Sequence, residues 1–113
     1  MRFSPDDTAR LRRGIMKRGR DLSELLAQVL AGKKPPALAS LLAGKPGMRP
    51  EEVLRMTLDS VEARRTLIDT DDDRFGRCDV CGVDLGLAAL GEMPWADRCA
   101  AHSAAHSAAH SAR

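Results

Sequence analysis

Residues 78–102 read CDVCGVDLGLAALGEMPWADRCAAH, and the sulfur and imidazole side chains of this stretch have the spacing of a four-ligand zinc site. Cys78 and Cys81 are separated by two residues, and seventeen residues later Cys99 and His102 repeat that spacing. Thiolate sulfur and imidazole nitrogen suit Zn²⁺, and a structural zinc site takes four such donors in a tetrahedron. Because side chains fill all four positions, the pattern predicts one structural Zn²⁺ with no open position for a substrate.

An alternative is that the cysteines are small buried apolar side chains. The paired spacing argues against it, as do Gly76 and Gly82, which flank the first pair and suit tight turns. The chain has three cysteines, and an odd number disfavours a framework made only of disulfides. A metal site in a reducing compartment is therefore the prediction. His106 stays open as a competing fourth ligand if the last turn is helical.

The chain has 113 residues, which corresponds to one domain. Its aromatic residues are Phe3, Phe75 and Trp95, so the core is thin and a metal cross-link is physically sensible. No apolar stretch is long enough to span a membrane, and no signal-peptide segment follows Met1. We expect a cytoplasmic monomer without a membrane partner.

Two amphipathic helices are predicted ahead of the cysteines. Ser4-Pro5-Asp6-Asp7 is typical of a helix start, because serine caps free amides, proline suits the first position and aspartate suits the positive dipole end. Apolar residues then recur every three or four positions until Gly32 ends the helix. Pro50-Glu51-Glu52 starts a second helix by the same logic. Gly14 and Gly19 weaken the first helix locally.

Helices of about 20 to 27 residues are about 30 to 40 Å long and pack as an antiparallel, coiled-coil-like hairpin. The predicted fold is mainly α. Its parts are a hairpin over residues 1–74 with a Pro/Gly-rich connection at 32–50, a zinc module over 75–103 at the base, and an Ala/His/Ser tail over 104–113. Residues 37–43 are predicted to add a short helix within the connection.

The tail repeats Ala-Ala-His-Ser with a period of four, which in a helix places His102, His106 and His110 on one face. Such a histidine stripe suits a second metal or a response to pH. The alternative, which the composition favours, is a low-complexity tail or helix with little function.

The net charge is only +2, but its distribution along the chain is uneven. A candidate basic patch lies near the N-terminus and consists of Arg10, Arg12, Arg13, Lys17, Arg18 and Arg20. Such a patch suits nucleic acid, although a solvated helix face is the commoner explanation. An acidic run, Asp69 and Asp71–Asp73, precedes the first cysteine. Its spacing matches no known cation loop, so a charged helix end is favoured.

Residues 51–102 resemble the DksA/TraR-type C4 zinc-finger family. The resemblance rests on Phe-Gly-Arg-Cys-Asp-Val-Cys-Gly at 75–82, on Leu85 and Leu90, and on Pro-Trp-Ala-Asp-Arg-Cys at 94–99. It implies a helical hairpin with a zinc module at its base. It also implies binding to bacterial RNA polymerase at the secondary channel, where acidic residues of the hairpin tip act near the catalytic centre, often together with ppGpp.

The sequence departs from that family in two places. The fourth ligand is usually cysteine, whereas His102 stands here, and a Cys3His set is still a normal zinc site. The family's tip motif has the form Asp-x-x-Asp-x-Ala, whereas residues 32–50 hold no acidic residue and carry Lys33, Lys34, Lys45 and Arg49. Short family members carry the acidic motif near the N-terminus, which makes Asp7 a candidate functional acid. A role at the start of the helix also explains why aspartate stands at position 7, and this second explanation is favoured.

The leading prediction is a zinc-containing transcription regulator that binds RNA polymerase and modulates initiation. The alternative is a small basic nucleic-acid-binding module, or an adaptor that presents Leu38, Leu41 and Leu42 to a protein partner, with zinc as a staple in either case. An enzyme is the least favoured class, because the sequence offers neither a nucleophile–base pairing nor a phosphate-binding glycine loop.

Overall fold

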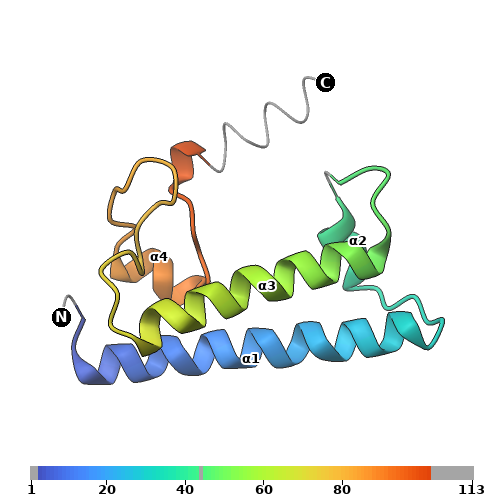
Figure 1. Cartoon of the computed structure of the whole chain (residues 1–113), viewed down its shortest axis with the longest axis horizontal. Helices are drawn as coiled ribbons and strands as arrows, with labels where there is room; N and C mark the ends of the chain where they lie inside the picture. The colour runs from blue at the N-terminus through green and yellow to red at the C-terminus, as the bar shows by residue number, and fades with distance from the viewer. Residues whose placement is uncertain (1–2, 44, 103–113) are drawn as a thin grey trace.

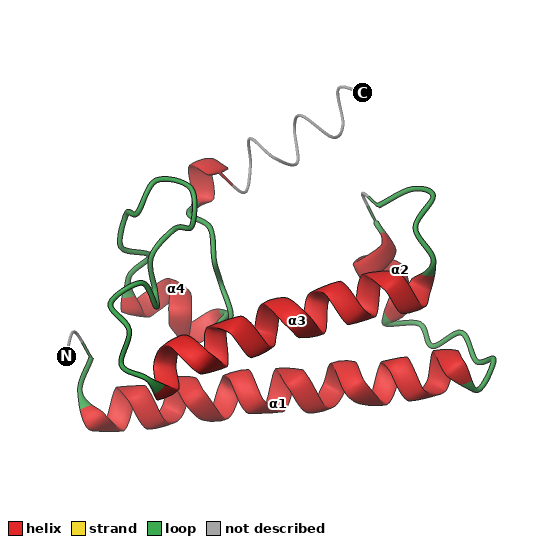
Figure 2. Ribbon diagram, viewed as in Figure 1, coloured by secondary structure: helices red, strands yellow, loops and turns green. Residues whose placement is uncertain are grey.

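A computed structural model of the chain describes residues 3–43 and 45–102, and this part is mainly helical (Figures 1 and 2). The helices are α1 (Pro5–Leu30), α2 (Leu38–Leu42), α3 (Pro50–Asp69) and α4 (Leu87–Glu92). Helices α1 and α3 pack side by side and run in opposite directions. The connection between them lies at one end of the hairpin, and residues 75–102 lie at the other, near the start of α1 (Figure 1). The predicted fold class is confirmed.

Helix α1 begins as the sequence predicts. Pro5 is its first residue, and the hydroxyl of Ser4 accepts a hydrogen bond from the backbone N–H of Asp7 at 3.0 Å. The cap satisfies one of the amides that a helix N-terminus leaves free. Helix α3 likewise begins at Pro50, but no side chain caps it.

Removing the α1 cap should therefore have a measurable cost. We expect Ser4→Ala to lower the free energy of unfolding by about 1 kcal/mol, because the Asp7 amide loses its acceptor. Urea denaturation followed by circular dichroism measures this change. Ser40→Ala is the control, since that hydroxyl donates to a carbonyl in the connection rather than capping a long helix. Equal stability of wild type and Ser4→Ala contradicts the capping role.

The core runs along the α1–α3 interface and continues into the C-terminal segment. Its buried members are Leu11, Ile15, Leu22, Leu38, Leu54, Val61, Ile68, Phe75 and Leu90. Phe75 comes from the loop after α3 and Leu90 from α4, so the segment that carries the three cysteines shares one core with the hairpin. Helix α4 was not predicted from the sequence. Among the described helices, none combines the length and apolar character needed to cross a membrane.

Helix α2 corrects one expectation about the hairpin tip. The adaptor hypothesis required Leu38, Leu41 and Leu42 to be presented to a partner. Leu38 is instead 5% exposed, and the other two are half-buried against the core. Helix α2 packs on α3 (Figure 1), so these side chains serve the fold and the expectation is wrong.

Candidate metal centre

The first pair of cysteines lies in a tight loop after α3. The N–H of Cys78 donates to the carbonyl of Val83 at 2.9 Å, and the N–H of Gly82 donates to the carbonyl of Cys78 at 2.8 Å. Gly82 has a φ of 77°, a left-handed conformation that favours glycine and that the sequence predicts at this position. The chain thereby reverses direction within a few residues and turns Cys78 and Cys81 toward the same point.

The second pair approaches from the segment that follows α4. Residues 100–102 form the start of a helical turn, so the two-residue spacing brings Cys99 and His102 to one side of it. The ring Nδ1 of His102 lies 3.1 Å from Cys99 Sγ and 3.4 Å from Cys78 Sγ. The competing ligand His106 lies outside the described residues, as does the tail over 104–113.

The geometry of the four side chains fits a tetrahedral metal. Their ligand atoms all lie within 4.8 Å of one another, and the Sγ atoms of Cys81 and Cys99 are 3.9 Å apart. Bonds of about 2.3 Å to sulfur and about 2.0 Å to nitrogen place tetrahedral donors about 3.5–3.8 Å apart. Cys78 is buried and Cys81 is exposed, so one side of the cluster faces solvent. The four predicted ligands are therefore close enough to bind one metal ion, with His102 presenting Nδ1.

The protonation of the thiols also suits a cation. Burial raises the pKa of Cys78, but hydrogen bonds from backbone amides, including those of Cys99 and Cys81, outweigh it and lower that pKa to about 6. A further donor is the N–H of Val80, 3.4 Å from Cys78 Sγ. The amide of Val83 lowers the pKa of Cys81, yet burial and the neighbouring thiols raise it on balance. A divalent cation would offset the repulsion between neighbouring thiolates and let all three thiols ionise.

The segment between the ligand pairs is pressed against α1. A methyl group added at Gly14 would lie 2.6 Å from Cγ of Pro94, so α1 and this segment touch where α1 has no side chain. Beside this contact, the guanidinium carbon of Arg18 lies 4.8 Å from the centroid of the Trp95 ring, a cation–π contact. Neither contact has a local signal in the sequence, where Gly14 is only a weak helix residue and Arg18 only one charge of a basic patch.

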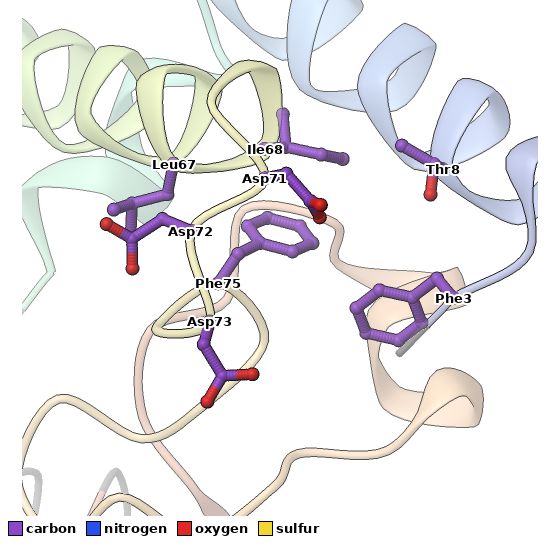
Figure 3. Close-up of a pocket in the computed structure, with 8 residues that line it drawn as sticks. All are labelled: Phe3, Thr8, Leu67, Ile68, Asp71, Asp72, Asp73 and Phe75. Carbon is purple, nitrogen blue, oxygen red and sulfur yellow. The ribbon is translucent and has the colours of Figure 1, made fainter. Parts of the chain in front are cut away.

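The acidic run after α3 borders a hollow of about 310 Å³, drawn in Figure 3. Phe3 and Phe75 meet edge to face in it, with ring centroids 6.0 Å apart. The hollow is lined by Phe3, Thr8, Leu67, Ile68, Asp71, Asp72, Asp73 and Phe75. Asp71 has a φ of 54° where the chain leaves α3, and the N–H of Asp72 closes the helix end on the Leu67 carbonyl at 2.9 Å.

Arginines neutralise most of this acidic run. The Arg74 guanidinium, 2.8 Å away, holds the pKa of Asp72 at about 2. Asp69 pairs with Arg12 at 2.6 Å, and Asp73 lies 3.4 Å from Arg77. Within residues 3–43 and 45–102, the cysteine–histidine cluster is the group of potential ligands that converges on a point. The run is a charged helix end, as the sequence favoured.

The candidate basic patch is largely engaged within the molecule. Arg10 pairs with Asp7, Arg12 with Asp69 and Lys17 with Asp21, and Arg18 stacks on Trp95. Arg13 and Arg20 are exposed, and no ion pair with another described residue is found for either. The six cations of α1 therefore do not form one free basic surface, because three of them pair with a carboxylate and one stacks on Trp95.

Asp7 lies in the first turn of α1, and that end of the hairpin is opposite to the connection between α1 and α3 (Figure 1). Asp7 occupies the first turn of α1, where its amide is capped by Ser4 and its carboxylate pairs with Arg10. At the tip, Lys33, Lys34 and Lys45 are exposed, and Arg49 pairs with Glu51 and Glu52. A functional role for Asp7 stays a prediction.

Comparison with known proteins gives one partial similarity. A stretch of 45 residues, 40% of this chain, is 42% identical to part of the RNA polymerase-binding transcription factor DksA of Haemophilus influenzae. That stretch spans 30% of the relative's length, so most of the relative has no counterpart in the match. No family model matches the chain, and no solved structure matches it. The chain is thus similar to a bacterial transcription factor over a limited part of its length.

Proposed function

We propose that this chain is a zinc-containing transcription regulator that binds RNA polymerase. The observation that carries the proposal is the combination of a partial match to an RNA polymerase-binding factor with a Cys3His cluster at the base of an α-helical hairpin. Fold alone would not license the inference, since helical hairpins serve many functions.

Zinc is the metal that the donor set favours. Three thiolates and one imidazole in tetrahedral positions select Zn²⁺ over Mg²⁺ or Ca²⁺, which prefer oxygen ligands. With all four positions filled by side chains, the ion would hold residues 75–102 in shape and supply no reactive water. Its role is to fix the base of the hairpin.

The hairpin is the part proposed to enter the secondary channel of the polymerase. Its tip carries Lys33, Lys34 and Lys45, and residues 32–50 hold no acidic residue. A lysine at the end of the hairpin would be repelled by bound Mg²⁺ and attracted to phosphate groups, the opposite of a carboxylate. We therefore propose that the chain modulates initiation differently from a factor with an acidic tip. A contact with ppGpp at the polymerase surface belongs to the same proposal.

Direct binding of nucleic acid is the weaker alternative. Arg10, Arg12 and Lys17 already face carboxylates, and Trp95 is covered by Arg18 and so is not a free platform for a base. Nucleic-acid binding through this face would show a steep dependence on salt concentration.

A binding assay with core RNA polymerase tests the proposal. We expect immobilised chain to retain the core enzyme of its source organism at about 1 μM, and a factor that occupies the secondary channel to compete. Chelation of the metal should abolish binding, because the base of the hairpin loses its staple. Retention is read by gel and by surface plasmon resonance.

Charge reversal locates the contact. Lys33→Glu combined with Lys34→Glu changes the tip, and Arg13→Glu combined with Arg20→Glu is the matched control on α1, where both side chains are exposed. If only the tip variant stops competing with a secondary-channel factor for core polymerase, the result supports insertion of the tip. Failure of the wild-type protein to bind core polymerase refutes the proposed function, and an equal loss in both variants refutes the tip contact.

A further inference from the structure

Arg64 is a buried cation that reaches from the hairpin to the metal centre. Its side chain, on α3, is 8% exposed, whereas the other ion-paired cations of the described residues are 34–78% exposed. Its Nη2 donates to both carboxylate oxygens of Asp79, at 2.9 and 3.0 Å. Asp79 directly follows the ligand Cys78. One side chain thus connects α3 to the loop between the first two ligands.

Burial of the Arg64 guanidinium makes this pair unlike the surface pairs, whereas the Asp79 carboxylate is itself 47% exposed. An arginine does not lose its proton in a protein, so a buried guanidinium without a carboxylate carries a large desolvation penalty. Nη1 of Arg64 has no hydrogen-bond partner among the described residues, which leaves Asp79 as the group that compensates the charge. If the loop of Asp79 moved away, α3 would keep an uncompensated cation at its interface.

Asp79 in turn needs Arg64. A zinc ion with three thiolates and a neutral imidazole carries one net negative charge, since two positive charges face three negative ones. The Asp79 carboxylate adds a second negative charge next to Cys78. The backbone N–H of Asp79 donates to the carbonyl of Asp97 at 2.8 Å, which joins the loop to the segment leading into Cys99. Arg64 is the buried cation in direct contact with this carboxylate, and the exposed Arg74 also interacts with it electrostatically.

We propose that Arg64 is a positioning residue for the metal centre and that, through Asp79, it couples metal occupancy to the stability of α3. The proposal rests on the metal binding proposed above. With the metal bound, the loop is fixed and the buried cation is paired. Without the metal, the loop loosens and Arg64 destabilises the helix on which it lies.

The coupling predicts two effects of opposite sign in one variant. Arg64→Met keeps an unbranched side chain of similar length and removes the charge. Its zinc affinity should fall about 10- to 100-fold, the range for residues that support metal ligands. Its metal-free form should nevertheless be more stable than metal-free wild type, because an apolar side chain replaces an unpaired buried cation. A merely structural arginine would lower stability with and without metal.

The experiment is a double-mutant cycle on the full chain. Zinc affinity is measured by competition with a chromophoric chelator for wild type, Arg64→Met, Asp79→Asn and the double variant. We expect the double variant to lose less affinity than the product of the two single losses. Arg65→Met is the matched control: it is the next residue of α3, and its ion pair with Glu62 lies on the surface. It should bind zinc like wild type.

Hydrogen exchange of the α3 amides gives a second readout. Removing zinc should accelerate exchange in wild type and have a smaller effect in Arg64→Met. If Arg64→Met does not fold, Arg64→Lys takes its place, since it keeps the charge and loses the guanidinium fork; its affinity should then fall between those of wild type and Asp79→Asn. Wild-type zinc affinity in whichever Arg64 variant folds, or additive losses in the cycle, overturns this inference alone. Wild-type protein that binds no zinc overturns the metal site itself.

Discussion

Cys78→Ser is expected to abolish stoichiometric zinc binding and to unfold residues 75–102. Structural zinc contributes about 10–16 kcal/mol in zinc-finger peptides at neutral pH, which matches or exceeds the whole stability margin of about 5–15 kcal/mol of a typical domain. Cys78 is the most buried of the three cysteines, so a serine there also leaves a polar hydroxyl away from water. Metal content by mass spectrometry and thermal melting by circular dichroism measure the two effects.

The histidines of the C-terminal repeat supply a matched control. His102 and His106 each follow two alanines and precede a serine, so the two substitutions differ only in position. His102→Ala should lose the metal, because its Nδ1 lies within 3.1–3.4 Å of two thiols. His106→Ala should keep it. The reverse result would make His106 the ligand, and full zinc in Cys78→Ser would rule out the tetrahedral site described above.

The features that the sequence predicted are those with local causes. Both ends of α1 and the start of α3 follow from serine, proline and glycine within one turn of the boundary, and the ligands follow from a two-residue spacing that repeats. Helix α4 was missed because it has six residues and no capping side chain, and a segment that short cannot be assigned as helix from apolar periodicity.

The features that the sequence did not predict depend on contacts between distant residues. Arg64 and Asp79 are fifteen positions apart, and each looks like an ordinary surface charge in the sequence. Burial of Leu38 was missed for a related reason, since an apolar residue in a Pro/Gly-rich connection carries no sign of the helix that covers it. The repeated cysteine and histidine spacing indicates that residues 75–102 form a separate metal-binding segment. Which surface of the hairpin this segment contacts depends on pairs of residues that are far apart in the sequence.

Gly14 is the position where helix propensity and tertiary packing predict opposite results. Replacing an internal helix glycine with alanine normally stabilises by about 1 kcal/mol. At Gly14, however, the new methyl would lie 2.6 Å from Cγ of Pro94, which is inside contact distance of a rigid ring. Overpacking of this kind costs about 1–3 kcal/mol. Subtracting the propensity gain, we expect Gly14→Ala to be less stable than wild type by up to about 2 kcal/mol, as measured by urea denaturation of the zinc-loaded protein.

Gly19 is the matched control in the same helix. An added methyl there would lie 3.9 Å from Cγ1 of Val61, an ordinary contact, so Gly19→Ala should gain about 1 kcal/mol. The Pro94→Ala background separates the two causes, because removing the ring removes the clash while the propensity gain remains. Gly14→Ala should then become stabilising. If Gly14→Ala stabilises wild type as much as Gly19→Ala does, the segment before Cys99 does not dock on α1 at Pro94, since a close contact with Pro94 would prevent that gain at Gly14.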